Sequence, residues 1–485
     1  MATRMKPADV VIVGMGWTGA IFAKELTDAG LNVVALERGR FRDTEPDFAP
    51  GRIHDELAFA VRHHLMQDVS RETLTFRNHT SQTALPMRQL GSFLPGEGVG
   101  GAGVHWNGQT WRFLADDFRI RTHSVERYGK TAMPDDMTIQ DWPVSYDELE
   151  PYYDRFEYLC GVSGKAGNLK GVKVEGGNPF EGPRSRDYPN PPMKYALGMS
   201  MFEDAAKSLG MHPFPQPSSN LSRPYTNPYG VAMGSCVYCG FCERFGCEAQ
   251  AKASPQASVL PAVMGKQNFE LRTNAQVLKV LVDKRAGKAT GVLYLDASGR
   301  EVEQPAELVV LAAFGLNNVH LMLLSGIGEP YDPKTNRGTV GRNYAYQIVS
   351  AVAGFFPDRL FNSFMGAGAL ASVVDDFNGD NFDHGPLGFI GGGYILAANT
   401  GARPIQYHPV PDGTPKWGAG WKRAVKQWYL RTMSIGTHGG VMAHRGNHLD
   451  LDPTYRDVYG RPLLRMTFDF TDNEQKMAGH LTQVA

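Results

Sequence analysis

Four of the five cysteines fall within one short segment, CVYCGFCERFGC. Cys236, Cys239, Cys242 and Cys247 are separated by two, two and four residues. Thiolates at such short spacing can hold an iron–sulfur cluster, because backbone turns wrap around it, and four thiolates also suit structural zinc. The last gap and the Glu248 that follows differ from the ferredoxin pattern, which ends in a gap of three and a proline. The segment predicts a metal site, with buried free thiols or disulfides as the remaining alternative.

Three glycines near the N-terminus have the spacing of a phosphate-binding turn. Gly14, Gly16 and Gly19 follow the apolar run of residues 9–13, and Glu37 lies 18 residues beyond Gly19. In such a turn the first glycine permits the bend, the second lets a pyrophosphate approach the backbone, and the third lets helix and strand pack closely. An acid in the place of Glu37 binds the hydroxyls of an unphosphorylated ribose. The pattern predicts a site for FAD or NAD.

A second glycine-rich segment, GEGVGGAGVHWNGQTWRF, spans residues 96–113. Its glycines would let the backbone lie against a flat or anionic ligand, and the alternative is a mobile surface loop. His105 lies inside this segment, where it could face the ligand or make a structural hydrogen bond. Three later histidines, His438, His444 and His448, have spacings that fit no common metal pattern, so we expect ordinary strand or loop histidines there.

A strand–helix–strand unit must position the first glycines. Residues 9–13 indicate a buried strand, residues 20–30 an amphipathic helix and residues 31–37 a second strand. The N-terminus of such a helix offers free N–H groups and a favourable dipole to an anion. Further along, Ser145 and Glu148 have the spacing of a capping box that opens another helix.

Several segments in order resemble the glucose–methanol–choline (GMC) family of oxidoreductases. After the two glycine-rich segments come WPVSYDELEPYYDRFE, NFELRTNAQVLKV, AELVVLAAFGLNNVHLMLLSGIG and VGRNYAYQ, so that the resemblance runs from residue 8 to about residue 347. It implies FAD rather than NAD. It also implies an α/β FAD-binding Rossmann-like domain interleaved with an α+β substrate domain that is built on a mostly antiparallel sheet.

The second glycine-rich segment is similar to the second flavin-contacting motif of that family. Gly100, Gly101 and Arg112 match it, whereas Trp106 stands where the family often has Asn, with Asn107 one place later. Gly103 also departs, because the family often has Ser there. The resemblance places Val277 against the adenine. The full set of FAD-binding residues expected here is Gly14, Gly16, Gly19, Glu37, Gly98, Gly100, Gly101, Gly103, Asn107 and Val277.

Longer stretches, such as DDFNGDNFDHGPLGF and LDLDPTYRDVYGRPLLRMTFDF, resemble the flavoprotein subunits of membrane-bound gluconate 2-dehydrogenases. The resemblance implies oxidation of a secondary alcohol of a sugar or sugar acid by hydride transfer to flavin N5, with D-gluconate to 2-keto-D-gluconate as the expected reaction. It implies an electron relay through a 3Fe–4S cluster, for which Cys236, Cys242 and Cys247 are the favoured ligands and one cysteine is spare. Zinc has no redox chemistry and could not serve as this relay.

The same resemblance implies partners and a location. A multihaem cytochrome c subunit would pass the electrons to quinone. A small exported subunit would accompany the chain to the periplasmic side of the bacterial inner membrane. Two other interpretations stay open, namely a GMC-type flavin oxidase that uses oxygen, for which the cysteines have no evident use, and a non-catalytic FAD-binding fragment.

We expect the two domains to alternate along the chain. In the family, the catalytic histidine follows a strand like RPLLRMTFDF, and here the sequence stops soon after it, so we expect a truncated chain. The principal catalytic histidine would lie in the missing segment, and His105 is the candidate among those present. The expected parts are an FAD-binding domain at 1–110 and 225–345, which includes the cysteines, a substrate domain at 111–224 and 346–459, and the start of the C-terminal part at 460–485.

Composition excludes several classes of partner. The formal net charge of −1 and the pI near 6.9 favour neither nucleic acid nor an anionic membrane. The apolar run at residues 10–23 contains the glycine turn and has no small-residue cleavage site after it, so we expect no signal peptide. No stretch approaches the roughly 20 apolar residues that span a bilayer. Contact with a membrane is therefore expected only through partners.

Overall fold

The computed structural model describes residues 2–48, 65–89, 94–401 and 407–485. Its first sheet has seven strands in the order β11-β3-β2-β14-β13-β12, with β1 paired to β14. The strands β11, β3, β2 and β14 are parallel, whereas β14, β13 and β12 are antiparallel. The seven strands are β1 (Thr3–Arg4), β2 (Ala8–Val13), β3 (Val33–Leu36), β11 (Phe269–Arg272), β12 (Gln276–Asp283), β13 (Lys288–Leu295) and β14 (Glu301–Leu311).

The N-terminal strand–helix–strand unit is present as predicted. The helix α1 (Trp17–Asp28) joins β2 to β3, and it begins earlier than expected because Gly16 is its N-cap. The residues of β2 are almost all buried, which is typical of a central parallel strand covered on both faces. The helix α6 (Gly315–Ser325) packs against β12.

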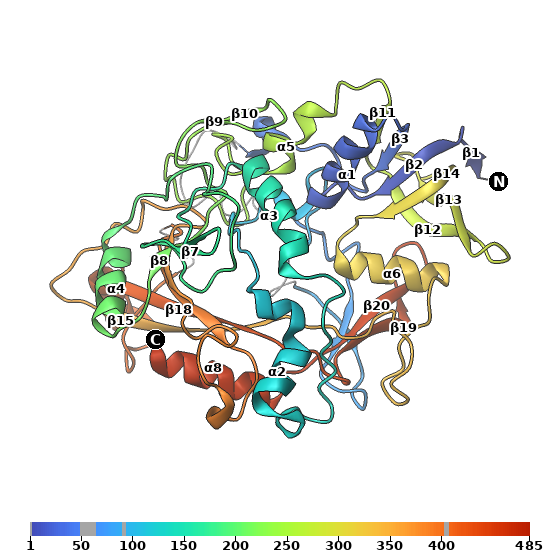
Figure 1. The fold of residues 1–485 in the computed structure, drawn as a ribbon. Coiled ribbons are helices and arrows are strands. Elements are labelled where there is room, and N and C mark those ends of the chain that lie inside the picture. Colours follow the sequence, from blue (N-terminus) through green and yellow to red (C-terminus); the bar gives the residue numbers. More distant parts are fainter. Residues whose placement is uncertain (1, 49–64, 90–93, 402–406) are drawn as a thin grey trace.

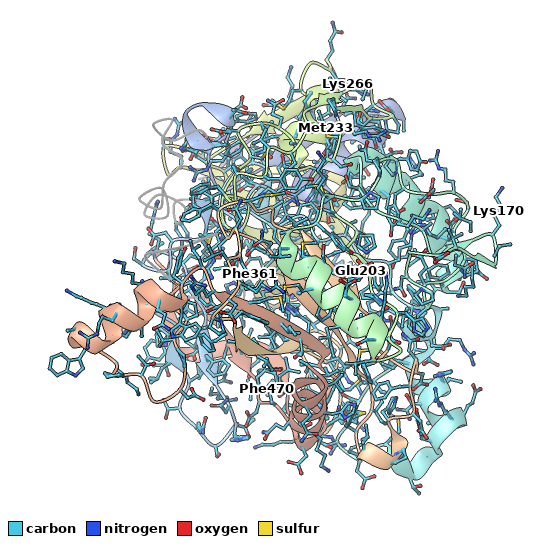
Figure 2. The ribbon with its side chains drawn as sticks, turned by 90° about the vertical axis from the view of Figure 1, so that its left-hand side faces the viewer. Lys170, Glu203, Met233, Lys266, Phe361 and Phe470 are labelled. Atoms are coloured by element: carbon cyan, nitrogen blue, oxygen red, sulfur yellow. The ribbon has the colours of Figure 1, made fainter. Side chains whose placement is uncertain are left out.

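The second sheet is antiparallel throughout, in the order β15-β18-β17-β16-β8. One face is covered by α8 (Asp472–Val484), which packs on β15 and β18, and by α4 (Leu197–Ser208), which packs on β16 and β17. Figure 2 shows α4, which carries Glu203, in front of this sheet. The strands are β8 (Phe214–Pro215), β15 (Gln347–Phe355), β16 (Ala371–Val374), β17 (Gly393–Ala398) and β18 (Thr432–Gly440).

A third sheet of four strands, in the order β19-β20-β4-β5, lies beside α6. In the view of Figure 1, the helix α3 (Tyr146–Cys160) runs down the middle of the molecule and α2 (Ile120–Tyr128) lies below it. Ser145 and Glu148 form the predicted capping box at the start of α3. The strands of the third sheet are β4 (Thr75–Arg77), β5 (Leu85–Pro86), β19 (His448–Arg456) and β20 (Pro462–Thr467).

The remaining elements are short. They include the strand pairs β6 (Asn168–Leu169) with β7 (Val172–Lys173) and β9 (Tyr225–Thr226) with β10 (Ala232–Met233), and the helix α5 (Pro255–Ser258). The helix α7 (Gly418–Trp428) is longer, with 11 residues. Within the ranges that the structure describes, none of the helices is both long enough and apolar enough to cross a bilayer. The predicted fold class is confirmed. A mixed sheet of the α/β type is combined with an antiparallel sheet that carries helices on one face. The exact domain boundaries stay predictions.

Candidate functional site

The first glycine turn connects β2 to α1 in a way that leaves backbone groups free. Gly14 has φ +94°, and a Cβ there would lie 2.7 Å from the carbonyl oxygen of Ala312. A Cβ on Gly19 would collide with the carbonyl of Gly14, so that only glycine allows this close contact between helix and strand. No side chain caps the N-terminus of α1. The turn therefore presents uncapped N–H groups and the positive end of a helix dipole, which suit a pyrophosphate.

Glu37 at the end of β3 is buried beside this turn, with 6% of its surface exposed. One carboxylate oxygen accepts a hydrogen bond from the Met15 N–H at 3.0 Å, and the other accepts one from the Gly39 N–H at 2.9 Å. The carboxylate thus braces the turn after β2 and the turn after β3. It also lines the cleft described next, in the place expected for an acid that meets a ribose.

A cleft of about 250 Å³ opens at the carboxyl ends of β2 and β3, where an α/β sheet usually binds its ligand. We call it the dinucleotide cleft. The indole N–H of Trp17 is buried without a partner among the described residues, and Trp17 lines this cleft. Six of the ten expected FAD-binding residues line the cleft, namely Gly14, Gly16, Glu37, Gly101, Gly103 and Val277.

The two glycine-rich segments lie against each other at this cleft. The Gly100 N–H donates to the carbonyl of Met15 at 2.7 Å, and a Cβ on Gly101 would lie 3.2 Å from the Cα of Gly16. Gly98 and Gly100 have φ values of +110° and +96°, so they shape the second segment without lining the cleft. The backbone of both segments therefore forms a cradle that fits the ADP portion of a dinucleotide.

Some residues that line the dinucleotide cleft are not among those predicted from the sequence. Arg461 directly precedes β20, and it donates to the carbonyls of Val277 and Leu278 at 3.3 Å. His320 on α6 bonds the carbonyl of Pro462 at 2.8 Å. Both line the dinucleotide cleft. They come from segments far apart in the sequence, and no local pattern marks either one.

His105 lines neither the dinucleotide cleft nor the larger cavity described below. Its side chain is 4% exposed, and burial lowers its pKa to about 4, so the ring is neutral at pH 7. Its carbonyl accepts a hydrogen bond from the Arg244 N–H at 2.7 Å. His105 therefore lies against the cysteine-rich segment, and its catalytic role stays a prediction that this position does not favour.

The four cysteines of residues 236–247 lie in one region, where their thiols interact electrostatically with one another, and some of them also make separate hydrogen bonds. Cys242 donates to the Asn220 side-chain oxygen at 3.2 Å, and Cys247 accepts from the N–H groups of Ala251 and Lys252 at 3.4 Å. Over the described part of the chain, no group of three or more His, Cys, Asp or Glu side chains is arranged to hold a metal ion. The predicted metal site is thus not formed as the side chains stand. Cys160 is a buried thiol in the core, as expected.

Lys252 ties the cysteine-rich segment to the second glycine-rich segment. Its side chain is 1% exposed, and its ammonium donates to the carbonyls of Trp106, Cys242 and Phe245 at 2.5, 2.9 and 2.7 Å. The Trp106 indole in turn donates to the carbonyl of Ala253 at 2.8 Å. A buried cation needs such acceptors. The two segments therefore form one packed unit, and the sequence marked them only as separate motifs.

A larger cavity of about 980 Å³ lies on the face of the second sheet opposite α8. We call it the sheet cavity. Asn107, expected at the flavin, lines this cavity and not the dinucleotide cleft. Tyr394 of β17 pairs with His438 of β18, and their rings stack at 5.0 Å, while Trp111 stacks on Tyr394 at 4.7 Å. These three aromatic side chains form one wall.

Arg112 also lines the sheet cavity, but its charge is already paired. Its guanidinium makes two hydrogen bonds of 2.8 Å to Glu157 and one of 3.0 Å to Glu150. Burial alone would lower the pKa of Arg112, but these hydrogen bonds raise it overall. Arg184 also bonds Glu157, at 3.2 Å, which makes a buried network of two arginines on one carboxylate. This arginine, matched to a flavin-contacting motif, acts in the structure to hold the cavity wall.

Comparisons with known proteins agree with this architecture. The gluconate 2-dehydrogenase flavoprotein of Pantoea cypripedii is 52% identical over 482 residues, which cover 99% of this chain and 78% of the relative. The 2-methyl-1,2-propanediol dehydrogenase of Mycolicibacterium austroafricanum is 26% identical over 485 residues, which cover 99% of this chain and 80% of the relative.

Solved structures share the fold. Pyridoxine 4-oxidase from Mesorbium loti matches with a TM-score of 0.53 at 16% identity, over 98% of this chain and 79% of that chain. Formate oxidase from Aspergillus oryzae RIB40 matches with a TM-score of 0.52 at 14% identity, over 99% of this chain and 80% of that chain. A family model described as GMC oxidoreductase matches residues 225–349. The chain therefore belongs to the GMC oxidoreductase family.

Proposed function

We propose that this chain is the FAD-binding part of a dehydrogenase that oxidises a secondary alcohol of a sugar acid, with D-gluconate to 2-keto-D-gluconate as the reaction. The observation that carries the proposal is the dinucleotide cleft, built from two glycine-rich segments, in a chain 52% identical to a gluconate 2-dehydrogenase flavoprotein. The paired Arg112 and the aromatic wall of the sheet cavity add a second enclosed space that could receive a substrate.

The residues of the cleft have separate tasks in this proposal. Gly14, Gly16 and the N-terminus of α1 would hold the pyrophosphate, Glu37 would meet the ribose, and Val277 would contact the adenine. FAD, when bound, supplies the hydride acceptor N5. Gly101 and Gly103 also line the cleft and would let the backbone approach the cofactor closely. Proton acceptance from the alcohol is not assigned to His105, because that ring lines neither space.

The electron relay is also a proposal, and it rests on the family resemblance. Among the described residues, no group of three or more possible ligands is arranged to hold a single metal ion, but the four thiols lie close enough to interact electrostatically. The four cysteines lie within one short segment at the spacing that supports the relay. Iron and acid-labile sulfide analysis with electron paramagnetic resonance would test it. One 3Fe–4S signal per chain is expected, and a protein with bound zinc or free thiols would contradict it.

The partners and location follow from the same resemblance. We propose a multihaem cytochrome c subunit that passes electrons to quinone, a small exported subunit, and a place on the periplasmic side of the inner membrane. Co-purification of the chain with both subunits from the membrane fraction is the expected result. A chain recovered alone from the cytoplasm would contradict it.

An anaerobic visible spectrum tests the reaction. The chain is loaded with FAD, and D-gluconate is added without oxygen. Bleaching of the flavin bands is expected, and reoxidation by a one-electron dye but not by oxygen would separate a dehydrogenase from an oxidase. Bound FAD that stays oxidised would favour the non-catalytic interpretation. A chain that binds no FAD would overturn the proposed function.

A further inference from the structure

One wall of the dinucleotide cleft is formed by an irregular stretch of edge strand. The strand β12 is the last in the order of the first sheet, and its register with β13 shifts between Val277 and Lys279. Leu278 therefore stands opposite no residue of β13, which makes this stretch a bulge. Val277 is 5% exposed and lines the cleft. Because a bulge interrupts the regular pairing of a strand, contacts from outside the sheet contribute to the position of this wall.

Arg461 makes such a contact from the turn at residues 457–461, which connects β19 to β20. Its Nη1 donates to the carbonyls of Val277 and Leu278, both at 3.3 Å. The Val277 carbonyl also accepts a longer hydrogen bond, of 3.4 Å, from the side chain of Gln276. One guanidinium nitrogen thus bridges the two residues at the bulge and joins the third sheet to the first.

The guanidinium of Arg461 is itself held in place by Asp457, at the other end of the same turn. One carboxylate oxygen accepts from Nε of Arg461 at 2.7 Å, and Nη2 lies 2.7 Å from that oxygen. The other oxygen accepts from the backbone N–H groups of Tyr459 and Arg461 at 2.9 Å. The Asp457 side chain is 1% exposed. Because a guanidinium is planar and rigid, this pairing fixes the direction in which Nη1 points.

A second contact ties the same region to α6. Nε2 of His320 on α6 bonds the carbonyl of Pro462 at 2.8 Å, and His320 also lines the cleft. The helix α6 packs against β12, and the side chain of Ser325 accepts from the Val280 N–H at 2.9 Å. The strand β12, the helix α6 and the turn that carries Arg461 therefore brace one another at this wall.

We propose that Arg461 is a positioning residue, which fixes the backbone of Val277 and Leu278 as a preformed wall for the adenine ring of FAD. The inference rests on the proposed function, in which Val277 contacts the adenine. A wall that is ordered before the ligand arrives loses less entropy on binding than a mobile one, so the ligand binds more tightly. Arg461 acts through Val277 and Leu278, and this role requires no contact of its own with the cofactor.

Titration of the full chain, freed of cofactor, tests the proposal with two probes. FAD is the whole cofactor, whereas ADP carries only its adenine half. Arg461→Gln removes the planar fork that spans the two carbonyls, so the Kd for FAD and the Kd for ADP should both rise by about fivefold to twentyfold. Arg461→Lys keeps a cation that can donate to one carbonyl but lacks the fork, and its Kd values should lie between those of the wild type and Arg461→Gln.

The matched control is Arg465→Gln, on the strand that follows the same turn. The Arg465 side chain is 17% exposed, against 14% for Arg461, and it pairs with Asp450 at 2.7 and 2.6 Å. Arg465 does not line the cleft. Arg465→Gln should therefore lower the melting temperature of the chain about as much as Arg461→Gln, but it should keep both Kd values within about twofold of the wild type. This control separates the shape of the wall from general stability.

Three results would overturn the inference. They are wild-type Kd values in Arg461→Gln, an equal rise of the Kd values in Arg465→Gln, and a rise for FAD without a rise for ADP, which would place the effect at the flavin half. If the wild-type chain binds FAD and ADP but shows one of these results, only the inference about Arg461 fails. If the wild-type chain binds neither probe, the proposed function fails as well.

Discussion

The dinucleotide cleft and the sheet cavity are built in opposite ways. The cleft is built around two glycine-rich turns, and its first turn, Glu37 and the strands that carry them come from residues 8–39. The cavity is lined by residues from the segments 107–120 and 139–143, from strands of the second sheet, and from the segment after β18 as far as residue 443. A backbone site constrains residue type at a few glycines, whereas a side-chain site constrains the whole packing around it. The two should therefore respond differently to mutation.

The largest effect is expected in the network that holds the cavity wall. Glu157→Gln removes the carboxylate shared by Arg112 and Arg184 and leaves two buried cations without it. Breaking a buried ion pair by removing one partner costs about 3 to 5 kcal/mol, so we expect a loss of that size in the free energy of unfolding. Chemical denaturation measures it. Glu126→Gln, in an exposed pair with Arg119, should change stability by less than about 0.5 kcal/mol. If Glu157→Gln and Glu126→Gln lowered the free energy of unfolding equally, the expected difference between the buried network and the exposed pair would be contradicted.

A smaller effect, confined to the cleft, is expected from Gly14→Ala. The positive φ of Gly14 and the clash of a Cβ with Ala312 would distort the turn, so the Kd for FAD should rise at least about tenfold. Fluorescence titration with FAD measures this Kd, with Gly265→Ala as the control because a Cβ there meets nothing within 4 Å. Unchanged FAD binding would show that the cleft does not depend on this turn.

The smallest effect is expected where α8 is anchored beneath the sheet cavity. Glu474 at the start of α8 contacts His444 at 3.3 Å and accepts from the Met442 N–H at 3.1 Å, and Met442 lines the cavity. Burial acts to lower the pKa of His444, but Glu474 and Asp136 raise it above 6.5 overall. A raised histidine pKa stabilises the fold at low pH, and this contribution is lost as the pH rises through the folded pKa.

The free energy of unfolding should therefore fall between pH 6 and pH 8 by an amount that His444→Gln removes. Denaturation curves at several pH values measure this slope. Burial would raise the pKa of Glu474, but its bonds to His444 and Thr471 lower it to about 2, so Glu474 stays ionised over this range. The control is His408→Gln, at a histidine whose ring packs against Trp421. This variant should keep the wild-type slope. If the slope is unchanged in His444→Gln, the His444–Glu474 pair does not cause the pH dependence of stability.

Motifs with short spacing predicted their structures well. The glycine turn, Glu37 and the capping box at Ser145 depend on contacts within one strand, turn and helix, so local spacing is enough to predict them. The cysteines show the limit of such spacing. Their separation suits a metal, yet in the described residues no three of them are arranged around a single ion, and Cys242 bonds Asn220, which lies outside the segment. Side-chain partners brought together by folding decide what a cluster of thiols does.

By itself, the sequence determined the dinucleotide turn, because the turn depends on glycine conformation and on the local periodicity of apolar residues. The family and the combination of an α/β sheet with an antiparallel sheet followed from the resemblance of several segments, in order, to GMC oxidoreductases. Only the tertiary structure decided that Arg112 is a paired cation, that Asn107 lies in the sheet cavity, and that Trp111, Asp375 and His438 share one wall. Those facts depend on strand register and on the packing of segments more than 300 residues apart, and no local pattern encodes them.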